Sequence, residues 1–446
     1  MAEDDARDAA GRDTLEHDRT VSTARDLIRF DTSTYGEGRS EGEQEAAEYL
    51  AARLEALGLR VERFDAAPGR RSILSRVPGR NPDKPALVVH GHTDVVPADP
   101  GQWSVDPFAG VVRDGMLWGR GAVDMKNMDA MILTALEDLL GEGRAPEREL
   151  IVAFFADEEN GGVYGAGRMV AERPELFAGA SEAISEVGGY SIHVGGRRAY
   201  LLQTGEKALM WIRLRARGRS AHGSRAIPPE QNTIIVLARA IAALGAHDWP
   251  VRVNRTSEAM IRRLAEILGV DPVATGPEEI VLRTGKAAGF LSATLRTTVN
   301  PTVLQAGYKH NVIPEEALVS IDVRPFPGEE DAVLAEIRRI VGDEVEVDPG
   351  FRDIGTEADP DGELLRAAAA AIHRRDPGAP VLPYFMPAGT DNKSLARIGI
   401  TGYGFAPLRL PADLDFPAMF HGIDERVPLD ALVFGRETLK DFLTSY

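Results

Sequence analysis

Cysteine is absent from the 446-residue sequence. Its absence excludes disulfides, cysteine nucleophiles, cysteine-held iron–sulfur clusters and thiolate zinc sites. Any transition-metal site must therefore be built from His, Asp and Glu. Basic residues are also outnumbered: 51 Lys and Arg face 69 Asp and Glu, and the formal net charge is −18. Because nucleic acids and anionic membranes attract a surplus of Lys and Arg, we expect neither as a partner.

Long apolar runs and targeting signals are missing as well. No run approaches ~20 apolar residues, so no segment is predicted to cross a bilayer. Residues 1–20 are polar and acidic and lack the apolar region of a signal peptide. We therefore expect a cytoplasmic protein. The hydrophobic fraction of 43% is typical of a globular chain, and the length predicts two or three domains at ~100–200 residues each.

Apolar runs alternate with helical patterns in the first 206 residues. Ser72–Val77, Ala86–His90 and Leu150–Ala156 are predicted strands, and Asp129–Leu140 is a predicted helix between the last two. This alternation is typical of an α/β domain with a mainly parallel central sheet. The same character returns after Gly350.

The middle of the chain has a different pattern. Over Ala208–Gly218 apolar residues alternate with arginines, which predicts a strand with one solvated face. Further strands are expected at Ser292–Val299 and Ala317–Arg324. The order strand–helix–strand–strand–helix–strand predicts a small ferredoxin-like α+β sandwich. We therefore predict one domain formed by residues 1–206 and 351–446, interrupted by an inserted domain at 207–350. The stretch Trp249–Thr284 has no place in this pattern.

The strongest local signal is the segment His90-Gly91-His92-Thr93-Asp94, just after a predicted buried strand. Open α/β sheets bind ligands at the carboxyl ends of their strands. His92 and Asp94 are two residues apart and share a face of an extended chain. A carboxylate beside an imidazole is a common support for a metal-bound His. A buried His with a purely structural role explains the segment equally well.

Acidic residues follow other predicted strands and turns. Ala156-Asp157-Glu158-Glu159 ends a strand so apolar that unpaired charge there would be costly, although a solvated loop is the alternative. Asp124 lies between a Gly-rich turn and a helix, where a helix cap is favoured for a lone carboxylate. Glu186, in Ser185-Glu186-Val187-Gly188-Gly189, and His421, in Phe420-His421-Gly422-Ile423-Asp424-Glu425, are weak signals when each is taken alone.

Together and in this order, the five segments resemble those of the M20 family of metallopeptidases and amidohydrolases. This family includes aminoacylases, acetylornithine deacetylase, succinyl-diaminopimelate desuccinylase, glutamate carboxypeptidase and dipeptidases. The resemblance runs from about Val21 to the end of the chain. It implies a zinc-exopeptidase-like catalytic domain, with residues 207–350 as a lid and dimerisation domain. A homodimer that forms through the lid is therefore expected.

The resemblance also implies a centre of two divalent metal ions. The implied ligands are His92, Asp124, Glu159, Glu186 and His421. One ion would be bound by His92 and Glu186, the other by Glu159 and His421, and Asp124 would bridge them. Glu158 resembles the general base, and Asp94 the residue behind His92. Zn²⁺ suits ligands of this kind, with Co²⁺ or Mn²⁺ as substitutes.

Further implied features concern the substrate and the backbone. His222 resembles a lid His, often from the other subunit, that stabilises the oxyanion. Asn311 and Arg324 resemble a carboxylate-binding pair, and Gly389 and Thr390 a loop near the scissile group. Read without the resemblance, His222 and Arg324 are surface residues and Asn311 is a turn residue. A cis peptide bond is implied between Asp124 and Met125.

The implied activity is hydrolysis of an amide bond next to a free carboxylate. Substrates would be dipeptides, C-terminal peptides or N-acyl amino acids. A dedicated biosynthetic deacylase, of the acetylornithine or succinyl-diaminopimelate type, is an alternative within this chemistry. A catalytically silent binding or assembly protein on the same fold is an alternative of another class, which the intact ligand set opposes. The lack of a Gly-x-Ser-x-Gly elbow opposes a serine hydrolase.

Overall fold

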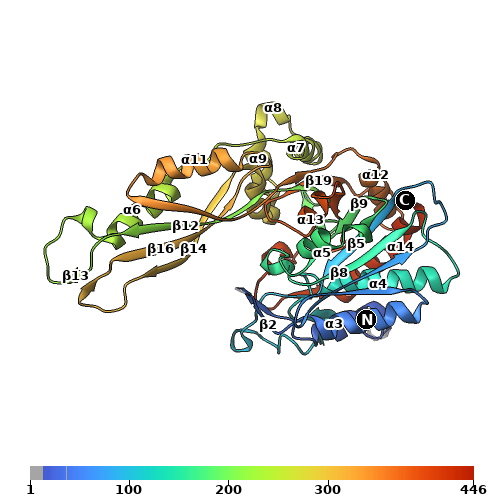
Figure 1. Ribbon diagram of the computed structural model, residues 1–446. Helices are drawn as coiled ribbons and strands as arrows, with labels where there is room; N and C mark the ends of the chain where they lie inside the picture. Colours follow the sequence, from blue (N-terminus) through green and yellow to red (C-terminus); the bar gives the residue numbers. More distant parts are fainter. Residues whose placement is uncertain (1–13, 37) are drawn as a thin grey trace.

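The structure, a computed structural model, describes residues 14–36 and 38–446. Within these residues the largest sheet has ten strands (Figure 1). Eight follow the order β10-β11-β20-β9-β5-β8-β4-β3, and β18 and β19 also pair with β11. Their bounds are β3 (Val61–Ala67), β4 (Arg70–Val77), β5 (Ala86–His92), β8 (Leu150–Phe155), β9 (Ala180–Ser185), β10 (Ser191–Val194), β11 (Arg197–Glu206), β18 (Thr356–Glu357), β19 (Val381–Met386) and β20 (Thr401–Gly404).

Parallel pairing is concentrated at the centre of this sheet. β5 pairs in parallel with β8 and β9, β9 with β20, and β19 with β11. β3–β4 and β10–β11 are antiparallel hairpins, and β4–β8 and β11–β20 are antiparallel too. The sheet is therefore mixed: the expected parallel pairing joins β20, β9, β5 and β8 at its centre and recurs between β11 and β19, but the remaining pairs are antiparallel. The outer hairpins need no crossover helix, so they lack the alternation on which the expectation rested.

Helices cover both faces of the sheet because its central strands are apolar on both sides. Leu87 and Val89 of β5 lie in one core cluster with α2, α3, α4, α12 and α14, whereas Ala86 and Val88 lie in another with α5 and α13. Burial on both faces explains why the central strands read as unbroken apolar runs. The helices are α2 (Arg19–Ile28), α3 (Gln44–Ala56), α4 (Lys126–Gly141), α5 (Ala166–Glu172), α12 (Glu363–His373), α13 (Asn392–Ala396) and α14 (Leu429–Ser445).

A second, smaller sheet projects from the main body (Figure 1). It is antiparallel, in the order β14-β16-β12-β17, and its strands are β12 (Leu209–Arg217), β14 (Thr298–Ala306), β16 (Glu316–Arg324) and β17 (Val345–Asp353). Met210, Ile212 and Leu214 of β12 are buried against α6 (Thr233–Ala246) and α11 (Glu330–Val341). Both the alternation over Ala208–Gly218 and the ferredoxin-like order of elements are as predicted.

The strand expected at Ser292–Val299 is displaced in the structure. β14 begins only at Thr298, because Ala293–Leu295 forms a 3₁₀ turn whose Leu295 is buried. β14 is an edge strand, exposed along most of its length. It therefore has no buried face to produce the alternation by which strands are recognised.

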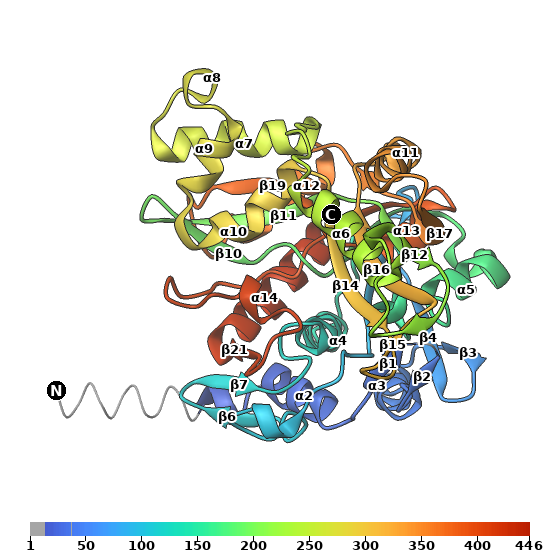
Figure 2. The same cartoon turned by 90° about the vertical axis from the view of Figure 1, so that its left-hand side faces the viewer.

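The unplaced stretch Trp249–Thr284 forms helices that lie against the larger sheet. Figure 2 shows α7 (Arg255–Leu268), α9 (Pro277–Leu282) and α10 (Ala288–Ser292) beside β19 and β11, with α8 (Pro272–Thr275) further out. Met260 and Leu264 of α7 and Leu291 of α10 join the core of the larger sheet. The limits at 206/207 and 350/351 stay predictions, but these helices pack with the main body.

Three short sheets complete the described chain. They are β1 (Thr34–Gly36) with β2 (Arg39–Ser40), β6 (Val111–Arg113) with β7 (Met116–Trp118) and β21 (Arg426–Pro428), and β13 (Ala221–His222) with β15 (Val312–Ile313). The last lies at the far end of the projecting sheet (Figure 1). None of the helices in the described part of the chain is both long enough and apolar enough to cross a bilayer.

Candidate metal centre and cleft

The five predicted metal ligands meet at one edge of the large sheet. His92 ends β5, Glu186 directly follows β9, and Asp124 stands two residues before α4. Glu159 lies in the 3₁₀ turn η2 (Glu158–Asn160) that follows β8, and His421 follows the turn η7 (Pro417–Met419). β5, β8 and β9 are parallel neighbours, so their carboxyl ends bring these loops together.

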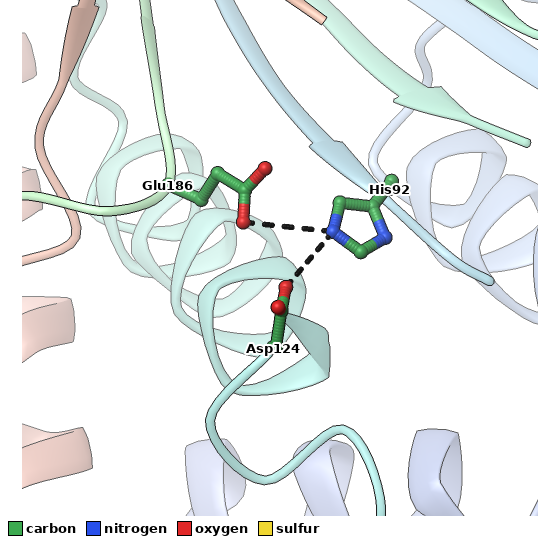
Figure 3. A group of neighbouring side chains, drawn as sticks. All are labelled: His92, Asp124 and Glu186. Atoms are coloured by element: carbon green, nitrogen blue, oxygen red, sulfur yellow. Dashed lines mark hydrogen bonds and ion pairs between the residues drawn. The ribbon is translucent and has the colours of Figure 1, made fainter. Parts of the chain in front are cut away.

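The first group of ligands comprises His92, Asp124 and Glu186 (Figure 3). His92 Nε2 lies 3.1 Å from Asp124 Oδ1 and 3.6 Å from Glu186 Oε2. All three residues are buried. Their polar atoms point toward one shared point, as the ligands of one ion must.

The second group comprises Asp124, Glu159 and His421. His421 Nε2 lies 2.9 Å from Glu159 Oε2 and 3.4 Å from Asp124 Oδ2. Asp124 thus presents one oxygen to each group. In both groups the ligand atoms lie within 4.8 Å of one another. Glu159 Oε1 is buried and has no hydrogen-bond partner in the described part of the chain. Two sets of one His and two carboxylates, with a shared Asp, fit a dinuclear site for Zn²⁺ or a similar cation.

The charges of the cluster favour bound cations. Burial raises the pKa of Glu186 to about 8, and the neighbouring Asp124 adds to this rise. Burial also raises the pKa of Glu158 far above its usual value, and Glu186 contributes. Buried carboxylates that repel one another are costly unless positive charge lies between them.

Glu158, the predicted general base, lies beside the ligands. Its Oε2 is 3.9 Å from His92 Nε2. Together with Asp124, Glu159, Glu186 and His421 it lines a cleft of about 540 Å³. A carboxylate in this place can exchange a proton with a molecule held in the cleft.

Asp94 supports the site through both its carboxylate and its main-chain oxygen. Its carboxylate accepts hydrogen bonds from the backbone N–H groups of Glu158 and Glu159, at 3.0 and 3.1 Å. His92 Nδ1 lies 3.0 Å from the Asp94 main-chain oxygen but 3.5 Å from its carboxylate. The main-chain oxygen therefore orients the imidazole, and the carboxylate holds the turn that carries Glu158 and Glu159.

Glu425 is a supporting residue that sequence reasoning did not single out. Its buried carboxylate accepts hydrogen bonds from the backbone N–H groups of Val123 and Asp124, at 2.6 and 2.9 Å, and pairs with Arg120 at 2.8 Å. Glu425 therefore holds the loop that presents the shared Asp124. Its place four residues after His421 is the signal that could have revealed it. The peptide bond between Asp124 and Met125 is cis, as predicted.

Three of the predicted substrate-binding residues line the cleft: Arg324, Gly389 and Thr390. The Arg324 guanidinium is bound by Asp322 through both carboxylate oxygens, at 2.7 and 3.0 Å. Thr390 Oγ1 donates to Glu206 at 3.1 Å. Both side chains therefore have strong partners within the chain. Asp322 lies two residues before Arg324 on the same strand, and this spacing is the signal for their pairing.

His222 and Asn311 lie elsewhere. His222 pairs with Val312 between β13 and β15, and Gly223 N–H donates to the Asn311 main-chain oxygen at 2.8 Å. The cleft is lined by Leu209 and Arg324, at the opposite end of β12 and β16. β12 alone spans ~25 Å, and β13 lies beyond its far end (Figure 1). The structure therefore separates Asn311 from Arg324, and His222 from the metal ligands, within one chain.

Comparison with known proteins identifies the family. Residues 88–445 match the Peptidase family M20/M25/M40. The chain belongs to this family. The N-fatty-acyl-amino acid synthase/hydrolase PM20D1 of Xenopus tropicalis is 28% identical over 381 residues, which cover 82% of this chain and 73% of that protein. Aminoacylase-1 of Pongo abelii is 27% identical, over 86% of this chain and 85% of the relative.

A solved structure shows the same fold. It is the M20 family metallo-carboxypeptidase Sso-CP2 from Sulfolobus solfataricus, with a TM-score of 0.73 and 18% identity, over 96% of this chain and 99% of the other. The predicted family is thus confirmed. The predicted class, a metallopeptidase-type hydrolase of amide bonds, is confirmed with it.

Proposed function

We propose that the protein hydrolyses an amide bond next to a free carboxylate, in dipeptides, C-terminal peptides or N-acyl amino acids. The observation that carries this proposal is the pair of His/carboxylate groups that share Asp124, with Glu158 beside them in the cleft. The names of the relatives support the substrate class. An N-acyl amino acid and a peptide C-terminus both place a free carboxylate next to an amide.

The proposed mechanism assigns separate tasks to the cleft residues. Two divalent cations, with Zn²⁺ the best fit, would be held by His92, Asp124, Glu159, Glu186 and His421. When bound, the cations supply the charge that makes water acidic and offsets the developing oxyanion. Glu158 takes a proton from the attacking water and later delivers it to the leaving amine nitrogen. Asp94 and Glu425 are positioning residues. Asp94 holds the turn that carries Glu158 and Glu159, and Glu425 holds the loop that carries Asp124.

We further propose that the protein works as a homodimer formed through the small sheet. β14 is an exposed edge strand, and the side chains of Val303 and Leu304 are 50% and 65% exposed. Ile234 of the neighbouring α6 is also exposed, at 43%. An uncovered edge strand with apolar side chains is a natural place for strand pairing between copies. A second copy would allow its His222 and Asn311 to reach the cleft of the first.

In this arrangement His222 would stabilise the oxyanion of the partner's substrate. His222 Nδ1 lies 2.7 Å from Ser224 Oγ, which leaves Nε2 to face a substrate oxygen. Asn311 would approach the substrate carboxylate from the same tip. These roles need two chains, because neither residue lies near its own cleft.

A panel of dipeptides and N-acyl amino acids, assayed with added Zn²⁺, Co²⁺ or Mn²⁺, tests the proposal. We expect metal-dependent hydrolysis of at least one class and its loss on chelation. The panel should include acetylornithine and succinyl-diaminopimelate, since activity confined to one of these would identify a dedicated deacylase. A protein that holds two metal ions per chain and yet hydrolyses none of the panel would contradict the proposal and favour a binding role.

A further inference from the structure

Two basic side chains besides His421 line the cleft. Arg324 comes from β16 of the small sheet, and Lys393 comes from α13, two residues after Asp391. Under the proposed function the cleft must hold a free carboxylate. The positively charged side chains of Arg324 and Lys393 are therefore the candidates for binding this carboxylate. The surroundings of these two side chains differ sharply.

Arg324 is already neutralised by a neighbour. Its Nε and Nη2 donate to the two oxygens of Asp322, which is the bidentate geometry that a substrate carboxylate would use. Trp211 Nε1 also donates to Asp322, at 3.1 Å, and fixes this carboxylate in place. Arg324 can offer a substrate only the donors that Asp322 leaves free.

Lys393 is buried without such a partner. The residue is 3% exposed, and its Nζ donates to the Lys207 main-chain oxygen at 2.8 Å. No carboxylate oxygen of the described residues lies within ion-pair distance of Nζ. An ammonium has three N–H donors, and a buried one is costly unless they are satisfied. Gly389 leaves room for this ammonium, because a Cβ at that position would collide with Nζ.

Glu206 supplies the compensating charge at longer range. It is buried, and its carboxylate accepts a hydrogen bond from Thr390 Oγ1 rather than from Lys393. Burial raises the pKa of Glu206 to about 7, and Lys393 opposes this rise. Burial lowers the pKa of Lys393, and Glu206 opposes that change. Glu206 therefore stabilises the ammonium but leaves its donors available to the cleft.

We propose that Lys393 is the principal cation that binds the free carboxylate of the substrate, with Arg324 in a secondary role. This inference rests on the proposed function. Lys393 lines the same cleft as Glu158 and Thr390, so a carboxylate bound there shares the cleft with the base. A desolvated ammonium with unused donors gains more from an incoming carboxylate than a guanidinium that already holds one.

The test compares an acid with its amide in the metal-loaded enzyme. The probes are the best N-acyl amino acid of the panel and its carboxamide, which lacks the negative charge. In Lys393→Met we expect kcat/KM for the acid to fall about 10- to 100-fold. The value for the carboxamide should change by less than about threefold. If the carboxamide reacts too slowly, its inhibition constant against the acid replaces kcat/KM.

Matched variants separate recognition from folding. Lys393→Arg keeps the charge and should retain part of the preference for the acid. Glu206→Gln with Lys393→Met removes both buried charges and keeps the test usable if the single variant is unstable. Lys207→Met is the control, because this neighbouring buried lysine donates to the carbonyl groups of Ala293 and Arg296 and does not line the cleft. It should leave the acid-to-amide ratio unchanged.

Two outcomes would overturn the inference. One is an equal loss for acid and carboxamide in the double variant, which would assign Lys393 a structural role. The other is an unchanged value for the acid in either variant that lacks Lys393. Failure of the proposed function itself looks different, because the wild-type protein would then hydrolyse neither probe nor any dipeptide of the panel.

Discussion

The metal centre and the far tip of the small sheet are built in opposite ways. The centre is gathered from loops of the large sheet, most of its residues are buried, and one chain supplies every proposed ligand. The tip is a pair of two-residue strands with an exposed His222, distant from the cleft of its own chain. The comparison suggests a division of the reaction. In the proposed mechanism, water activation would depend on one chain, whereas assistance to the oxyanion would depend on two.

The largest loss of activity is expected for a substitution at the metal centre. Glu158→Gln should lower kcat about 100- to 10,000-fold, because the amide cannot accept the proton of the attacking water. Metal content should stay the same, since Glu158 is not a proposed ligand. The control is Glu159→Gln, which should lose metal as measured by elemental analysis. Full activity in Glu158→Gln would refute the assigned base.

A smaller loss of kcat is expected when His222, at the tip of the small sheet, is changed. His222→Ala should lower kcat about 100- to 1,000-fold with metal content unchanged, because one donor to the oxyanion is lost. Steady-state kinetics on the best substrate of the panel gives this number. A variant as active as the wild type would remove His222 from the mechanism.

Mixing experiments sharpen the comparison between centre and tip. Glu158→Gln and His222→Ala chains, unfolded and refolded together in equal amounts, should recover about one quarter of wild-type activity. Half of the random dimers are then mixed, and each mixed dimer has one intact site of two. Refolding each variant alone is the control. No recovery, despite mixed dimers seen by mass spectrometry, would place His222 and Glu158 in the same chain's site.

A moderate loss of metal affinity and of stability is expected when Glu425, which holds the loop of Asp124, is changed. Glu425→Gln should weaken metal binding about 10- to 100-fold, because the loop that presents Asp124 loses a charged acceptor. It should also lower the free energy of unfolding by about 3 kcal/mol, because buried Arg120 is left unpaired. Metal titration and urea unfolding measure the two effects. Asp424→Asn is the control, since this carboxylate accepts hydrogen bonds from the backbone N–H and the hydroxyl of the exposed Ser104.

The smallest change in the free energy of unfolding of a single chain is expected for a substitution in β14, at the edge of the small sheet. Leu304→Lys should change the free energy of unfolding of the chain by less than about 0.5 kcal/mol, because Leu304 is exposed. It should nevertheless weaken the proposed dimer, seen by analytical ultracentrifugation, and activity should fall on dilution. Val273→Lys on α8, where the side chain is 91% exposed, is the control. An unchanged dimer would move the interface elsewhere.

The same contrast explains what could be predicted from the sequence. His92, Asp124 and Glu186 lie in or beside buried elements whose apolar pattern is strong, so their places along the chain were predictable. Their grouping as metal ligands was implied only by the family resemblance. The exposed β14 has no such pattern, and its start was misplaced. The helices within Trp249–Thr284 were not placed, because a helical period reveals a buried face but not which sheet covers it. Asn311 and Arg324 are close in sequence, yet the length of β16 separates them.

The turn that Asp94 holds has a practical consequence for redesign. Glu158 and Glu159 are adjacent in sequence, yet one is assigned to proton transfer and the other to an ion. Asp94 holds both backbone N–H groups, and from this one turn Glu158 reaches the side of His92 whereas Glu159 reaches His421. An engineer could therefore exchange Glu159 to alter the choice of cation while the base keeps its position, provided that Asp94 is left untouched.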